Sequence, residues 1–186
     1  MAERLKNHEM GNLARKLTPA EAAAKKRRKL TEDTSTTTHV AIFRVDDLSH
    51  GKARFQIDMN AQQLQLTGLA LVCRDAAARV NLVAVEGGPR GVRKFGRLMT
   101  KRILWDARDE RAEAESESGS VMDMEEEEEG RRVKNRCSLV WSGESHTRAF
   151  KQFVFQENRT RETALKWAQQ RQVGHWWTMA CNFVHE

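Results

Sequence analysis

The sequence has 186 residues, of which 31% are charged and 39% hydrophobic, and its formal net charge is +6. A positive balance favours a polyanionic partner, although a merely soluble basic protein would have the same total. Cys73, Cys137 and Cys181 are far apart and form no CxxC pair, which argues against a disulfide framework and a structural zinc site, and no metal or cofactor is expected. The sequence contains no apolar run of about eighteen residues, so no transmembrane helix is expected.

The first part of the chain is strongly basic and carries helix signals. Thr18-Pro19-Ala20-Glu21 is a capping box with proline at the first helical position, and three alanines lead from it into the run Lys25–Lys29. Residues 1–38 are therefore predicted to form a basic arm of two helices. Because the arm has little apolar surface to bury, we expect an RNA duplex to hold it; a nuclear-import signal on a solvated helix is a compatible alternative. The candidate RNA contacts of the arm are Arg15, Lys16, Lys25, Lys26, Arg28 and Lys29.

From His39 onward the pattern is that of a folded domain, which we predict to span residues 39–186. Short segments rich in β-branched and apolar residues predict strands at His39–Val45, Leu69–Cys73, Asn81–Val85, Cys137–Trp141 and Gln152–Phe155. Helices are predicted at Phe55–Leu66, at Pro89–Leu104, after a cap at Asn158 or Thr160, and after Gly174, where the apolar face is Trp177, Ala180, Cys181 and Val184. This order predicts an α+β fold of the ferredoxin-like (split βαβ) type, with an extra strand and two C-terminal helices.

An acidic stretch at residues 106–130 interrupts this domain. It ends in Asp123 and the run Glu125–Glu129, and it contains almost no large apolar side chains. Because such a segment cannot bury enough surface to offset its ordering entropy, we predict a disordered insertion. The remainder of the chain is then more basic than the total charge indicates.

The clearest local signal is the predicted helix Pro89–Leu104. At about 100° per residue, apolar side chains such as Val92, Phe95 and Met99 take one side of this helix, and five cations take the other. We call these cations the cationic stripe: Arg90, Arg93, Lys94, Arg97 and Lys101. Like charges at this spacing repel one another, and a bound phosphate backbone would offset the repulsion. The alternative is that acids elsewhere, such as those of the insertion, pair with the stripe.

Three further places combine turns with basic or aromatic side chains. Gly87-Gly88 could bring backbone amides to a phosphate, although Gly-Gly-Pro is more often a sharp strand-to-helix turn. Arg148 lies in the turn between two predicted strands, where a basic side chain is free to reach a ligand. Trp176 could stack on a base or pack against the sheet, and His175 could donate to a phosphate or cap the last helix.

The sequence offers little for an enzyme. Its acids are concentrated in the insertion, where they are badly placed for acid–base or metal chemistry, and HExxH, GxSxG and P-loop spacings are absent. Two function classes remain. One is a non-enzymatic RNA-binding scaffold, and the other is a protein-interaction module that docks partner proteins and binds RNA only weakly.

Several motifs run in a fixed order through nearly the whole chain: Ala14–Thr18, His39–Val45, Val85–Pro89, Leu139–Gly143 and His175–Trp177. Together with Lys94-Phe95, Arg97-Leu98-Met99, Arg148 and Phe150, they resemble the pre-mRNA-processing factor 3 family of the U4/U6 small nuclear ribonucleoprotein (snRNP). An acidic insertion between the two halves is also usual in that family. Trp176 stands where tyrosine is common, and the family's long N-terminal region is absent, so a reduced protein or a fragment is expected.

The resemblance implies a particular RNA and particular partners. A ferredoxin-like domain would hold the single-stranded 3′ end of U6 snRNA, and the basic arm would lie on the U4/U6 snRNA duplex. Such proteins are nuclear and not catalytic, and they act as assembly scaffolds of the U4/U6·U5 tri-snRNP in pre-mRNA splicing. The implied protein partners are other U4/U6 and tri-snRNP proteins, with no membrane and no small-molecule substrate.

Overall fold

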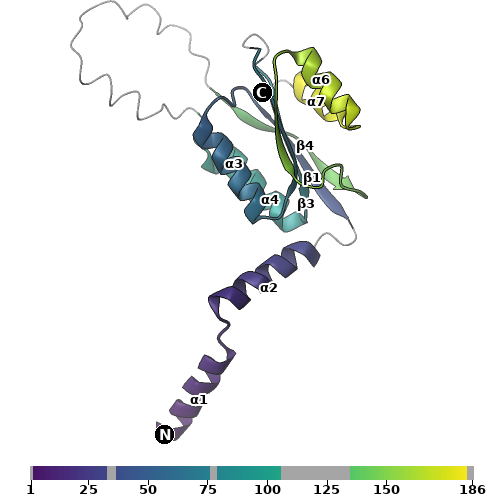
Figure 1. The fold of residues 1–186 in the computed structure, drawn as a ribbon. Helices are drawn as coiled ribbons and strands as arrows, with labels where there is room; N and C mark the ends of the chain where they lie inside the picture. Colours follow the sequence, from purple (N-terminus) through teal and green to yellow (C-terminus); the bar gives the residue numbers. More distant parts are fainter. Residues whose placement is uncertain (1, 33–36, 76–78, 106–134, 184–186) are drawn as a thin grey trace, which may run out of the picture.

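A computed structural model of the chain describes residues 2–32, 37–75, 79–105 and 135–183 (Figure 1). The elements in chain order are α1 (Ala2–Arg15), α2 (Pro19–Glu32), β1 (Thr38–Val45), α3 (Gly51–Gln63), β2 (Thr67–Cys73), β3 (Asn81–Gly87), α4 (Pro89–Arg97), η1 (Leu98–Arg102), β4 (Cys137–Ser145), β5 (Phe153–Asn158), α6 (Arg161–Gln170) and α7 (Gly174–Asn182). Residues 106–130, predicted to be a disordered insertion, and Val184, predicted for the last apolar face, lie outside the described residues.

The strands form one mixed sheet in the order β4-β1-β3-β2-β5. Neighbours are antiparallel from β4 to β2, and β5 adds to β2 in parallel. A register shift between Ile42 and Phe43 of β1 marks a bulge in the pairing with β4. The domain is therefore of the α+β class, with β4 and β5 as the edge strands.

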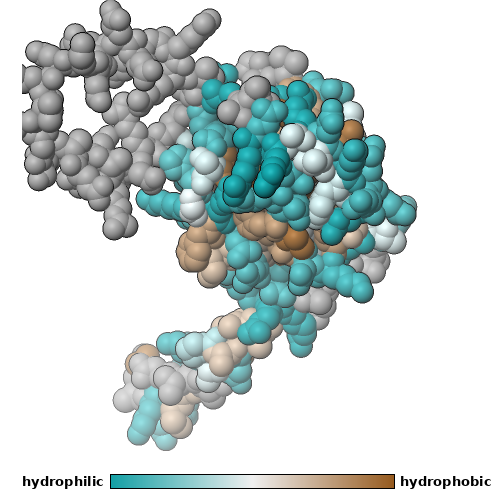
Figure 2. All heavy atoms as spheres, turned by 45° about the horizontal axis from the view of Figure 1, so that its top comes forward, coloured by the Kyte–Doolittle hydropathy of each residue, from teal (hydrophilic) through white to brown (hydrophobic). Residues whose placement is uncertain are grey.

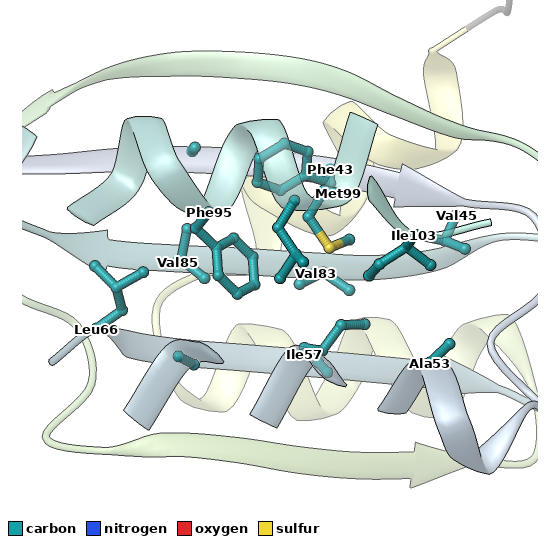
Figure 3. Close-up of a cluster of buried hydrophobic side chains, with 14 of the residues drawn as sticks. Phe43, Val45, Ala53, Ile57, Leu66, Val83, Val85, Phe95, Met99 and Ile103 are labelled. Atoms are coloured by element: carbon teal, nitrogen blue, oxygen red, sulfur yellow. The ribbon is translucent and has the colours of Figure 1, made fainter. Parts of the chain in front are cut away.

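Helices cover both faces of this sheet, so the domain has three layers (Figure 1). On one face α3, α4 and η1 bury side chains such as Ile57, Phe95 and Met99 against Phe43 and Val85 of the strands (Figure 3). On the other face α6 and α7 contribute Ala164, Ala168, Trp176, Trp177 and Ala180 to a second cluster. Successive strand residues enter opposite clusters, which is why these strands are almost continuously apolar. Since neither face is open, a ligand has to bind at an edge, at an end of the sheet or on the helices.

The predicted strands are confirmed with shifted ends. β1, β2 and β3 each contain the predicted segment, and β4 runs on to Ser145. The strand predicted to end at Val85 runs on to Gly87, because Gly87 pairs with His39 of β1 and Glu86 lies between Val40 of β1 and Thr67 of β2.

Helix ends were predicted less well. α3 begins at Gly51 and not at Phe55, whose side chain is 66% exposed. Its N-cap residue, His50, makes no side-chain capping hydrogen bond, so the sequence carries no capping signal for this helix start. The helix predicted at Pro89–Leu104 is an α-helix only to Arg97 and continues as one π-helical turn. Thr160 caps α6 by exchanging hydrogen bonds with Thr163, so Thr160 rather than Asn158 is the cap.

Candidate nucleic-acid interface

α4 is held against the sheet in one orientation. Gly88 precedes it in an extended conformation. Pro89 stands in the first turn, where a residue without an N–H loses no hydrogen bond because the first amides of a helix have no helical partner. Val92 and Phe95 are buried, and the Phe95 ring lies 6.1 Å from that of Phe43. A methyl group on Gly91 would lie 3.1 Å from the Leu66 side chain, so α4 packs closely against the segment that leads into β2. This packing fixes which side of α4 faces outward.

The outward side carries the cationic stripe, and all five of its residues are exposed. Arg90, Arg93, Lys94 and Arg97 belong to α4, whereas Lys101 lies in η1, where the π-helical bonds end with Ile103 N–H donating to Leu98 O at 3.0 Å. The change of helix type shifts Lys101 from the place a continuous α-helix would give it. Within the described ranges, Arg93, Lys94, Arg97 and Lys101 form no ion pair. The alternative that the stripe pairs with the acidic insertion involves residues 106–130, which lie outside those ranges.

A groove of about 310 Å³ borders the stripe, between α4 and the β1–β4 edge of the sheet. Leu139 supplies exposed apolar surface, the buried residues Ala41, Phe43 and Val92 lie beneath it, and Arg93 and Arg97 also line the groove. Its remaining lining residues are His39, Pro89, Gly96, Thr100 and Ser142. His39 Nε2 lies 3.4 Å from Glu144 Oε1. The sequence did not indicate the groove, because β4 is brought near α4 by its pairing with β1, which is a contact between distant residues.

The β3 end next to α4 contains a buried carboxylate that no sequence signal indicated. Glu86 is 1% exposed, and its two oxygens accept hydrogen bonds from the backbone N–H groups of Ala149 (3.0 Å) and Phe150 (3.1 Å). The Thr67 hydroxyl donates to the same carboxylate at 3.5 Å. Burial raises the pKa of Glu86, and the three hydrogen bonds and the charge of Arg148 oppose that rise. Glu86 therefore attaches the β4–β5 connection, which carries exposed Arg148, to the centre of the sheet.

His175 and Trp176 lie on the opposite face of the sheet from the cationic stripe, at the start of α7. Trp176 is only 6% exposed and packs 6.2 Å from the Phe150 ring, which is the packing alternative rather than an open stacking platform. His175 is exposed, with its ring edge-on to Trp176 at 5.7 Å. The N-cap of α7 is Val173, so the alternative that His175 caps this helix is wrong. The structure thus brings Phe150, His175 and Trp176 together, with Arg148 two residues before Phe150, and places His175 and Trp176 on the opposite face of the sheet from α4.

The N-terminal helices α1 and α2 carry the remaining candidates. Thr18 and Glu21 exchange backbone hydrogen bonds, Thr18 N–H donating to Glu21 at 2.8 Å and Glu21 N–H to the Thr18 hydroxyl at 3.3 Å, which confirms the capping box. Hydrogen bonds donated to the Glu21 carboxylate by the backbone N–H and the hydroxyl of Thr18 lower the pKa of Glu21. Figure 1 shows both helices outside the three-layered domain. All six candidate cations are exposed: Arg15, Lys16, Lys25, Lys26, Arg28 and Lys29.

A larger hollow of about 710 Å³ lies where β1 and β2 end, and its lining includes no residue of α4. It is lined by acids and arginines together, and Glu157 accepts hydrogen bonds from both Arg54 (2.5 Å) and Arg74. These arginines lower the pKa of Glu157. Such internal neutralisation makes this hollow a poorer anion site than the stripe.

Other kinds of site find no support in the described part of the chain. It contains no cluster of three or more His, Cys, Asp or Glu side chains able to hold a metal ion. The surface seen in Figure 2 is mostly hydrophilic, with an apolar patch, and none of the described helices combines the length and apolarity needed to cross a membrane. The fold and this surface define an α+β domain with a basic helix and groove suited to a polyanion.

Comparison with known proteins assigns the family. Residues 41–180 match the model of the small nuclear ribonucleoprotein Prp3 C-terminal domain. The chain is 39% identical over 183 residues to Protein RDM16 of Arabidopsis thaliana, covering 98% of this chain and 22% of that protein. It is 34% identical over 179 residues to the U4/U5/U6 small nuclear ribonucleoprotein prp3 of Schizosaccharomyces pombe, covering 96% and 32% respectively. The chain belongs to the Prp3 family, which confirms the resemblance seen in its motifs, and it spans less than a third of the length of these relatives.

Proposed function

We propose that this chain is an RNA-binding, non-catalytic subunit of the spliceosomal U4/U6 snRNP. The observation that carries the proposal is the cationic stripe, whose charges are exposed on a helix fixed by its buried side. Mutual repulsion along the stripe is a local cost that phosphates would offset. Family membership suggests the RNA, since the S. pombe relative is named as a U4/U5/U6 small nuclear ribonucleoprotein.

In this proposal the groove and the stripe hold the single-stranded 3′ end of U6 snRNA. The exposed side chain of Leu139 suits a base, and Arg93 and Arg97 suit the neighbouring phosphates. Lys94 and Lys101 extend the cationic surface beyond the groove. The contacts would therefore follow backbone and shape more than base identity.

The exposed cations of α1 and α2 are assigned to the U4/U6 duplex. These helices have almost no buried side chains among the described ones, so a phosphate backbone would supply the surface that a protein core does not. Arg148 and His175 are assigned to RNA beyond the β3 end of the sheet. Trp176 is assigned to supporting the Phe150 ring, because so little of its indole is exposed.

The same proposal includes the fold type and the division of the chain. The order β4-β1-β3-β2, with antiparallel neighbours and α3 and α4 on one face, supports a ferredoxin-like (split βαβ) domain at residues 39–186, extended by β5, α6 and α7. Residues 1–38 form the basic arm. Other U4/U6 and tri-snRNP proteins are the proposed protein partners, and the nucleus is the proposed location.

A pair of RNAs tests the function. The chain should bind a U4/U6 duplex that carries the U6 3′ tail more tightly than the same duplex with a blunt end, and both affinities should fall steeply with salt. Equal affinities would remove the tail-binding claim. RNA binding that is weak at physiological salt, together with snRNP-protein binding that survives loss of the stripe, would favour the protein-interaction module instead.

A further inference from the structure

A buried side chain of β3 attaches the β4–β5 connection to the sheet. Glu86, at the end of β3, accepts hydrogen bonds from two successive backbone N–H groups, those of Ala149 and Phe150. Burial removes water from this carboxylate and so raises its pKa. The two backbone donors replace part of the lost hydration. Arg148 is the residue immediately before this pair of amides, and its own side chain is exposed.

Contacts on both sides of Arg148 restrict the same segment. Before it, the Ser145 hydroxyl donates to the Thr147 carbonyl at 2.9 Å. After it, the Phe150 ring is 8% exposed and packs against Trp176. The backbone around Arg148 is thus anchored to β3, β4 and α7, while the guanidinium extends outward.

We propose that Glu86 is a positioning residue, which holds the 146–150 connection so that Arg148 is presented to an RNA phosphate. This inference rests on the proposed RNA-binding function and adds a residue that does not itself touch RNA. An arginine on an unanchored loop loses backbone and side-chain freedom when it binds, and an arginine on an anchored loop has already lost part of it.

Charge and position predict opposite effects of removing the Glu86 carboxylate. Glu86 is a negative charge near Arg148, so its neutralisation would strengthen attraction to a polyanion if charge alone mattered. The positioning role predicts weaker binding, because the side-chain amide introduced by Glu86→Gln keeps one acceptor oxygen and turns a donor toward the other backbone amide. The sign of the change therefore separates the two accounts.

The test uses Glu86→Gln, Arg148→Ala and the double variant in the full chain, with a U4/U6 duplex carrying the U6 3′ tail as the probe. Glu162→Gln is the matched control, since it removes the same charge from exposed Glu162 of α6, which lines neither the groove nor the anchored segment. Glu86→Asp is a second variant that keeps the charge but shortens the reach to the two amides. Circular dichroism and thermal unfolding establish that each variant is folded.

We expect Glu86→Gln to weaken binding about two- to tenfold, the factor that corresponds to immobilising one long side chain. Arg148→Ala should lower the magnitude of the log–log salt slope by about 0.7, as expected for one lost phosphate contact. The Glu86→Gln effect should largely disappear in the Arg148→Ala background, and Glu86→Asp should weaken binding in the same Arg148-dependent way.

Two results would overturn the positioning role. One is binding by both Glu86 variants at wild-type strength or tighter. The other is a loss that is equally large without Arg148, since a general structural defect would produce it. Either result leaves tail binding by the wild-type chain intact, whereas absence of that binding would refute the proposed function itself.

Discussion

Removing charge from α4 should change the salt dependence of RNA binding by an amount that the structure sets. Arg93, Lys94 and Arg97 are exposed, and two of them line the groove, so each can neutralise one phosphate. Changing all three to alanine should lower the magnitude of the log–log salt slope by about 2.1 to 2.7, at roughly 0.7 to 0.9 per phosphate. Over a fourfold rise in salt, the factor by which wild-type affinity falls should therefore be about 20 to 40 times the factor for the variant.

The assay is a titration of labelled, tailed U4/U6 duplex at several salt concentrations. Alanine favours helix at these exposed positions, so the fold should remain intact. The matched control replaces Lys52, Arg159 and Lys166, which are exposed elsewhere on the domain, and thus removes the same charge. If the stripe variant keeps the wild-type slope, or if the control lowers the slope equally, then α4 does not make the phosphate contacts.

Three predictions concern the fold that positions the site. Phe95→Ala should destabilise the chain by about 3–5 kcal/mol in denaturant unfolding, because the ring is fully buried under α4; a loss below about 1 kcal/mol would contradict the packing. Gly68→Ala should add at least about 1–3 kcal/mol of strain, since φ is +142° and the new methyl would lie 2.1 Å from the Ala84 carbonyl oxygen; wild-type thermal stability would refute this close approach. Burial raises the pKa of Glu86 above its ordinary 4.5, so ionisation disfavours the folded state. Relative to Glu86→Gln, the wild type should then lose free energy of unfolding as pH rises from below 4.5 through the raised pKa. Unfolding titrations that show a relative gain in the free energy of unfolding over that range would contradict this prediction.

Local sequence signals predicted the features that depend on neighbouring residues. The capping box at Thr18–Glu21 and the two-sided pattern of α4 follow from spacings of three and four residues, and both are present. The segment His39–Val45 forms most of β1, as its β-branched and apolar residues predicted. The π-helical turn after Arg97 broke the periodic pattern without a sequence signal.

Features that depend on distant residues were not predictable in this way. Glu86 precedes Gly-Gly-Pro, which is typical of a turn, yet its carboxylate is buried because amides more than sixty positions along the chain meet it. The groove exists because β4 pairs with β1, which places Leu139 opposite α4. The burial of Trp176 likewise depends on Phe150 from another element.

A crosslinking map of the chain on a U4/U6 duplex, with and without the U6 3′ tail, tests the central claim most directly. The proposal predicts that crosslinks to α4 and the β1–β4 groove require the tail, whereas crosslinks to α1 and α2 persist on the blunt duplex. Crosslinks to α4 that are equally strong without the tail, or that are absent with it, would contradict the claim that the cationic stripe and its groove hold single-stranded RNA.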